Sequence, residues 1–277
     1  MSQATVIKEE MKSSPDMLSE TTKKMTFEEY LLYVPDDDFL YELDKGELIQ
    51  MSAPTILHTA ICEFLMYEIE KYLIAQLLPF LVHTSVGVRT DIASARIPDV
   101  IVCTESLWQS IINRKGAGVL NTGETPELVI EVVSENRSTD YQKKRNEYGL
   151  INIPEYWIVD SKKQRVRLLT NGEDEEGYAE QDFYPGENVV SQRFPGLIIS
   201  VDLILSAPIV KNLRQEKERQ FLQDIEEANQ RAESEKQRAE SEKQRAESEK
   251  QRAESEKQRA EKLAAKLKEL GIDADSI

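Results

Sequence analysis

Two carboxylic acids stand in apolar segments, where an isolated charge is costly to bury. Asp99 directly precedes the apolar residues 100–103, and Glu131 has three apolar residues before it and two after it. Both segments have the pattern of buried strands, in which an ionised carboxylate needs a partner. Taken alone, Asp99 could cap a turn or pair with a nearby arginine. Two such acids on neighbouring strands suggest a shared divalent cation, and their hard oxygen ligands suit Mg²⁺ or Mn²⁺.

A lysine in a later segment could act beside such a cation. Residues 138–149 form a basic stretch with a helical pattern, and Lys144 has Asp140 and Tyr148 four residues to either side, on one helical face. A divalent cation can activate water and stabilise charge on a scissile phosphate. If this face lies against Glu131, Lys144 can orient the nucleophile or neutralise the developing negative charge. The alternative is that Lys144 is an exposed surface lysine.

The elements that would position these residues alternate between strands and helices early in the chain, and strands follow strands later. The predicted strands are 79–91, 96–103, 126–134, 154–160, 164–170 and 177–185, with a hairpin about Asp44-Lys45-Gly46. A turn at 171–177 joins the strands 164–170 and 177–185, and residues 196–200 form a last strand or turn. The predicted helices are 25–34, 55–78, 138–149 and 201–205, and residues 107–123 form a short helix and a Gly-rich loop. This order favours an α/β or α+β fold, with a mixed central sheet and helices on at least one face.

The segment from about residue 207 has a different composition. The heptad RAESEKQ occurs four times in register from Arg231, and no Gly or Pro interrupts residues 211–270, so we expect a long helix. Each heptad offers one apolar residue, alanine, whereas a coiled-coil seam needs two. A solvated or weakly self-associating helix and an oligomerising coiled coil therefore both remain open. The leucines near its end are the better candidates for a contact: Leu263, Leu267 and Leu270.

Charge and cysteine content restrict the class of protein. The 277-residue chain has a net charge of −16, and its first 210 residues carry 19 Lys and Arg against 34 Asp and Glu. Such acidity does not favour nucleic-acid binding unless basic residues cluster on one face, because phosphate contacts need local positive charge. Cys62 and Cys103 lack metal-ligand spacing, so we expect buried thiols in a reducing compartment. Apolar runs are too short for a signal or a membrane span, so we expect a cytoplasmic protein without membrane contact.

Short motifs follow one another in a recognisable order. Tyr41-Glu42-Leu43, Gly46-Glu47-Leu48, Met51-Ser52 and His58 come first, followed by Pro98-Asp99, Glu131-Val132-Val133-Ser134, the Asp140–Lys144–Tyr148 spacing and PEYWIVD at 154–160. This order resembles the Uma-type restriction-endonuclease-like proteins, a bacterial branch of the PD-(D/E)xK nuclease superfamily, over roughly residues 25–205. The resemblance implies a restriction-endonuclease-like core, with a mixed sheet flanked by helices and a divalent metal at the acidic pair.

The resemblance also implies roles for individual residues. Asp99 matches the Asp of the nuclease motif and Glu131 matches its second acid, both as metal ligands. The superfamily usually has Lys at a third position, where this chain has Val133. In this branch the basic role falls to Lys144 on the following helix.

Two residues of the opening motif are implied as accessory members of the site. Glu47 is expected near the cleft as an additional acid of the metal shell. His58 is expected there as a proton-transfer or phosphate-contacting group, although it could equally serve only the start of its helix.

These observations predict a metal-dependent endonuclease that hydrolyses DNA phosphodiester bonds, with Mg²⁺ or Mn²⁺ as cofactor. Residues 25–206 would form the restriction-endonuclease-like domain, after a disordered tail at 1–24 and before a long charged helix at 207–277. The helix could join copies of the chain into a homo-oligomer. The alternative is an inactive, nuclease-like scaffold whose helical tail binds a partner, and Val133 and the acidic domain favour it.

Overall fold

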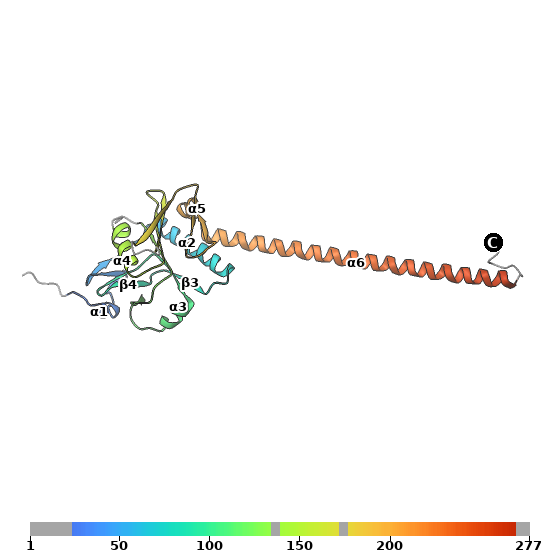
Figure 1. Cartoon of the computed structure of the whole chain (residues 1–277), viewed down its shortest axis with the longest axis horizontal. Coiled ribbons are helices and arrows are strands. Elements are labelled where there is room, and N and C mark those ends of the chain that lie inside the picture. The colour runs from blue at the N-terminus through green and yellow to red at the C-terminus, as the bar shows by residue number, and fades with distance from the viewer. Residues whose placement is uncertain (1–23, 134–138, 172–176, 270–277) are drawn as a thin grey trace, which may run out of the picture. The chain divides into compact units, whose positions relative to one another are not determined.

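The computed structural model describes residues 24–133, 139–171 and 177–269. The chain divides into two compact units, one ending at Val210 and the other beginning at Lys211 (Figure 1). The tail predicted to be disordered lies almost wholly outside the described residues, as do most of the turn predicted at 171–177 and Leu270.

The first unit is built on a six-stranded sheet with the order β11-β10-β9-β8-β6-β3. Its strands are β3 (Phe80–His83), β6 (Val100–Thr104), β8 (Leu128–Val132), β9 (Glu155–Asp160), β10 (Arg165–Asn171) and β11 (Tyr178–Phe183). β8 and β9 run parallel, and the other neighbouring pairs are antiparallel. A parallel pair needs a crossover connection, which the helices between these two strands supply. The predicted mixed α/β architecture is confirmed.

A second sheet has the order β2-β1-β5-β4-β7. The hairpin predicted about Asp44 is confirmed: Leu43 lies opposite Leu48, and Lys45 and Gly46 have positive φ angles of 49° and 86°. A two-residue turn of this kind matches the twist of the flanking strands. The strands are β1 (Tyr41–Asp44), β2 (Glu47–Gln50), β4 (Gly87–Asp91), β5 (Ser94–Arg96) and β7 (Val119–Leu120), and β12 (Asn188–Val190) and β13 (Ile198–Ser200) form a separate pair.

Side-chain caps fix where several helices begin. Thr26 forms a capping box with Glu29, and the hydroxyls of Thr55 and Thr104 accept from backbone N–H groups in the first turns of α2 and α3. The helices are α1 (Phe27–Leu31), α2 (Ile56–Ala75), α3 (Glu105–Ile111), the π-helix η1 (Thr139–Lys144), α4 (Arg145–Leu150) and α5 (Val201–Ser206). The first two were predicted correctly in type but are shorter than expected.

Apolar packing buries the centre of the six-stranded sheet. All residues of β8 and β9 are buried, as expected for strands that are covered on both faces. α2 packs against β3, β8 and α5 (Figure 1). A cluster around Tyr148 of α4 joins β6, β8 and β9 to β4 and β7 of the other sheet. A charged residue on β8 is therefore largely shielded from bulk water and needs partners within the protein.

Two segments that were each predicted as one strand form two strands in the structure. In each case the chain passes from one sheet to the other between the two strands. The predicted strand 79–91 consists of β3 and β4, and Ser85 between them has a φ of 57°, in the left-handed region. The predicted strand 96–103 is broken at residues 97–99, between β5 and β6. Asp99 therefore lies at the junction of the two sheets. The short strand β7, within the loop expected at 107–123, was not predicted because two residues show no periodicity.

The second unit is formed by the helix α6 (Val210–Glu269), which has 60 residues and confirms the predicted long helix. Its described side chains include no buried residue. None of the helices in the described part of the chain is both long and apolar enough to cross a membrane.

Candidate active site

A buried ion pair lies where α4 meets β8. Glu131 is 3% exposed and Lys144 is 6% exposed, and Lys144 Nζ lies 2.9 Å from Glu131 Oε1. The Tyr148 hydroxyl donates a 2.8 Å hydrogen bond to the same oxygen. Burial and the charge of Glu131 raise the pKa of Tyr148 well above its ordinary value, so this hydroxyl remains a donor. The predicted helical face thus meets Glu131 through these two residues, whereas the side chain of Asp140 lies outside the described part.

Asp99 lies beside Glu131 because of the strand register. β6 and β8 pair with Val100 opposite Ile130, and continuing this register by one residue sets Asp99 opposite Glu131. The backbone N–H of Val132 donates a 2.6 Å hydrogen bond to Asp99 Oδ2. The structure therefore brings the two predicted acids to one end of adjacent strands.

A third acid, Glu42 of β1, is buried and also contacts Lys144. Its Oε1 lies 3.3 Å from Lys144 Nζ and accepts a 3.1 Å hydrogen bond from the backbone N–H of Ile97. Glu47, the accessory acid that the resemblance implies, has a side chain that is 65% exposed and lies 3.8 Å from Lys24. The structure does not bring Glu47 to Lys144, whereas Glu42 of the same opening motif contacts it.

Arg96 connects Glu42 to two further carboxylates. Arg96 is 2% exposed and lies 3.4 Å from Glu42, 3.0 Å from Asp44 and 2.5 Å from Glu147. Burial by itself would lower the pKa of the guanidinium, but the bonds to Glu147 and the other acids raise it. Burial also disfavours the charged form of Asp44 and so acts to raise its pKa. Hydrogen bonds from Lys143 and Arg96 outweigh this effect and hold the pKa below its ordinary value. Arg96 and Asp44 are therefore both charged at neutral pH.

Among the described residues, the network has more acidic than basic side chains. Five carboxylates face three Lys and Arg side chains, so these eight groups have an excess of two negative charges when all are ionised. An excess of this size is what one divalent cation would neutralise, and carboxylate oxygens are ligands that suit Mg²⁺ and Mn²⁺. The residues present thus fit such an ion. The carboxylates are Glu42, Asp44, Asp99, Glu131 and Glu147, and the bases are Arg96, Lys143 and Lys144.

The site takes its lysine from a helix instead of from β8. Val133, at the usual Lys position of the nuclease motif, is 8% exposed, packs in the cluster around Tyr148 and donates its N–H to Val159 at 2.8 Å. Lys144 is the last residue of the π-helix η1, and α4 follows directly. π-helical turns are rare and occur frequently at functional sites. Here the wider turn ends at the residue that contacts Glu131.

His58 serves both the start of α2 and the acidic pair. Its backbone N–H donates to the Thr55 hydroxyl at 3.2 Å, and its Nε2 lies 3.2 Å from Asp99 Oδ2. Its Nδ1 lies 3.7 Å from the Cys62 sulfur. Burial and the charges of Asp99 and Glu131 raise the pKa of the Cys62 thiol, so the thiol stays protonated and can donate to Nδ1. Unlike the other accessory candidate, His58 is thus brought to the predicted site.

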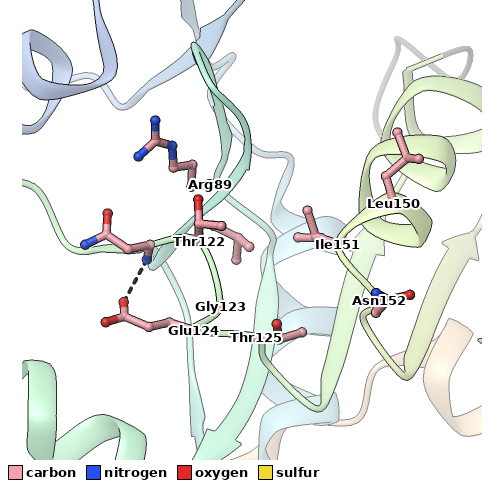
Figure 2. Close-up of a pocket in the computed structure, with 10 residues that line it drawn as sticks. Arg89, Thr122, Gly123, Glu124, Thr125, Leu150, Ile151 and Asn152 are labelled. Atoms are coloured by element: carbon pink, nitrogen blue, oxygen red, sulfur yellow. Dashed lines mark hydrogen bonds between the residues drawn. The ribbon is translucent and has the colours of Figure 1, made fainter.

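A separate cavity of about 350 Å³ lies between β4, residues 121–125 and the end of α4. Figure 2 shows Arg89 on one side of it, and the backbone N–H of Asn121 donates to Glu124 at 2.7 Å. The charged side chains of the network above do not line this cavity. We therefore do not place the active site there.

The mixed sheet flanked by helices is an α/β fold of the nuclease type. A solved structure described as a "putative nuclease belonging to DUF820 from Anabaena variabilis ATCC 29413" matches with a TM-score of 0.55 and 20% identity, over 67% of this chain and 99% of that one. At this identity the similarity shows the fold alone. A family model described as "Uma2: Putative restriction endonuclease" matches residues 27–202. The chain belongs to this family, and the predicted resemblance is confirmed. A search of curated proteins found no match.

The first prediction compares the two acids of the opening motif. Glu42→Gln should lower the free energy of unfolding by about 1–3 kcal/mol, because Arg96 and Lys144 lose a buried charged partner. Glu47→Gln, on the exposed side chain, should change it by less than about 0.5 kcal/mol. Urea denaturation of both variants measures the difference. Equal unfolding midpoints would contradict the central place given to Glu42.

Proposed function

We propose that this protein is a metal-dependent endonuclease that hydrolyses phosphodiester bonds in DNA. The observation that carries the proposal is the contact of Lys144 with Glu131 at 2.9 Å, in a buried, net-negative network that includes Asp99. Family membership and the nuclease fold support the same class of reaction. Both cysteines are buried free thiols, which suits a reducing compartment such as the cytoplasm.

Asp99 and Glu131 would hold the cation, Mg²⁺ or Mn²⁺. When bound, the ion supplies an acidified water molecule and neutralises charge on the scissile phosphate. The chain's own groups fix these two acids: the N–H of Val132 binds Asp99, and Tyr148 binds Glu131. Such fixed partners orient metal ligands and tune the metal.

Lys144 is the group we assign to the phosphate. A fixed ammonium beside the reacting centre stabilises negative charge that develops in the transition state. Glu42, at 3.3 Å, gives Lys144 a second carboxylate partner, so its position does not depend on Glu131 alone. Lys144 can also orient the attacking water. This arrangement gives a helix residue the role that the nuclease motif usually assigns to a strand residue.

Metal binding is the first test of this proposal. Asp99→Asn and Glu131→Gln should each weaken Mn²⁺ binding at least about tenfold, since each removes a ligand charge, and both variants should lose metal-dependent cleavage of DNA. Glu47→Gln removes an exposed acid of the same motif and should bind and cleave as the wild type does. Isothermal titration of the full chain with Mn²⁺ gives the affinities. Unchanged affinity in Glu131→Gln would show that the acids are not the metal site.

Adjacent lysines allow a matched test of the basic residue. Lys144→Gln should lower the cleavage rate by about 10²–10³-fold, because a fixed charge near the phosphate is lost. Lys143 is 37% exposed and pairs with Asp44, so Lys143→Gln should change the rate by only a few-fold. Single-turnover cleavage of DNA at saturating Mn²⁺ compares them. Equal losses in the two variants would remove Lys144 from its assigned role.

The alternative function is that of an inactive scaffold that associates through α6, and one feature of the helix favours association. Ile225 and Leu267 continue the seven-residue register of the alanines that recur from Ala232 to Ala260. Phe221 and Ile225 are 64% and 42% exposed, so apolar surface is presented at the start of this register. We infer that α6 joins copies of the chain into a homo-oligomer through a coiled coil.

Deletion of residues 211–277 separates the two functions. The remaining unit has its own buried core, so it should stay folded and become monomeric while the full chain is a dimer or larger. Light scattering coupled to gel filtration measures the masses. An enzyme keeps its turnover per site after the deletion. A full chain that associates but cleaves no DNA would instead support the scaffold.

A further inference from the structure

Three side chains of different chemistry meet at the start of α2. His58 and Cys62 are one helical turn apart, and Asp99 enters from the break between β5 and β6. The Cys62 sulfur lies 3.7 Å from His58 Nδ1, and His58 Nε2 lies 3.2 Å from Asp99 Oδ2. One ligand atom from each residue lies within 4.8 Å of the other two. The chain has two His and two Cys in all, so half of each gathers here.

This donor set differs from that of the acidic pair. A thiolate, an imidazole and a carboxylate are ligands typical of Zn²⁺ and similar ions, whereas Mg²⁺ takes oxygen. Ligand atoms of tetrahedral zinc, with bonds of about 2.0–2.3 Å, lie about 3.3–3.8 Å apart, so a shift on the order of 1 Å would complete the set. The side chains of His58 and Asp99 are 16% and 14% exposed, which leaves an entry path.

We propose that His58, Cys62 and Asp99 form a second metal site, selective for Zn²⁺ and similar ions, which shares Asp99 with the Asp99–Glu131 pair. On binding, the Cys62 thiol gives its proton to solvent and a metal–thiolate bond forms. His58 binds through one ring nitrogen and Asp99 through its carboxylate. A water molecule takes the fourth position.

The shared acid makes the two sites compete. An Asp99 carboxylate that is committed to zinc is withdrawn from its place beside Glu131, so Zn²⁺ should inhibit cleavage that depends on Mg²⁺. This consequence rests on the proposed function, whereas zinc binding itself does not.

The same proximity has a competing explanation without a metal. The Cys62 thiol can donate to His58 Nδ1, and His58 Nε2–H can donate to Asp99, which would orient that carboxylate. In that case the sulfur never becomes a ligand. A measurement that detects a metal–sulfur bond therefore decides between the two explanations.

Titration of the full chain with Co²⁺ provides this measurement, because a thiolate bound to cobalt produces a charge-transfer band in the near ultraviolet. We expect the band in the wild type, its loss in Cys62→Ser, and its displacement by equimolar Zn²⁺. Cys103→Ser is the matched control, since Cys103 is the other buried free thiol, and it should keep the band. No band in the wild type, or a band that survives Cys62→Ser, overturns the proposal.

A second pair of variants guards against misfolding of Cys62→Ser. His58→Gln keeps the thiol and should weaken Co²⁺ binding at least about tenfold, whereas His83→Gln, at the other histidine, should not. Circular dichroism confirms that each variant is folded. Equal Co²⁺ affinities in the two folded histidine variants would exclude His58 as a ligand and overturn the site.

Glu131→Gln distinguishes this site from the proposed nuclease centre. Glu131 is not one of the three ligands, so the variant should keep the cobalt–thiolate band while it loses Mn²⁺ binding. In Cys62→Ser, Zn²⁺ should no longer inhibit the Mg²⁺-dependent cleavage that the variant retains. A wild type that shows the band but cleaves no DNA supports the zinc site and contradicts the proposed function. Cleavage without the band contradicts the zinc site alone.

Discussion

The buried ion pair of Lys144 and Glu131 is the constraint on which the rest of the first unit depends. Both residues are less than one-tenth exposed, and taking two charges out of water costs several kcal/mol per ion. Their attraction offsets this cost only if the remaining donors and acceptors are also satisfied. Tyr148 donates to Glu131, and Glu42 is a second acceptor for Lys144. The pair therefore requires that β1, which carries Glu42, and the turn of α4 that carries Tyr148 both lie next to β8. The fold places both elements there.

Topology places these groups together. Glu42 comes from the five-stranded sheet, Glu131 from the six-stranded sheet, and Lys144 from the connection between β8 and β9. Because β8 and β9 are parallel, a crossover connection must join them. This connection contains η1 and α4, and it brings Lys144 next to Glu42 and Glu131. Arg96, at the end of β5, binds Glu147 of α4 and so ties the connection to the other sheet. The site is thus also the joint between the two sheets.

The parts of this arrangement with a local signal could be predicted from the sequence. An acid inside an apolar run and a lysine one helical turn from a tyrosine are both visible within a few residues. The choice of Glu42 over Glu47 is not, because both are acids of one hairpin and the selecting hydrogen bond comes from Ile97, 55 positions away. The split of the predicted strand 79–91 at Ser85 could not be predicted either, because it too depends on contacts with residues far away in the sequence. Its two halves pair in different sheets, and strand periodicity does not identify the partner strand.

The positions of the charged side chains show how an acidic protein could still act on a phosphate. Acidic composition counts against nucleic-acid binding, and several bases of the first unit are already in contact with carboxylates, among them Arg96, Lys144, Arg165 and Arg167. These side chains do not form an unpaired basic surface for phosphates. The network around Glu131 holds two of the excess negative charges among the described residues, and an approaching phosphate would be repelled there unless a cation neutralised them. Under the proposed function, metal dependence is therefore the condition that makes phosphate chemistry compatible with so acidic a protein.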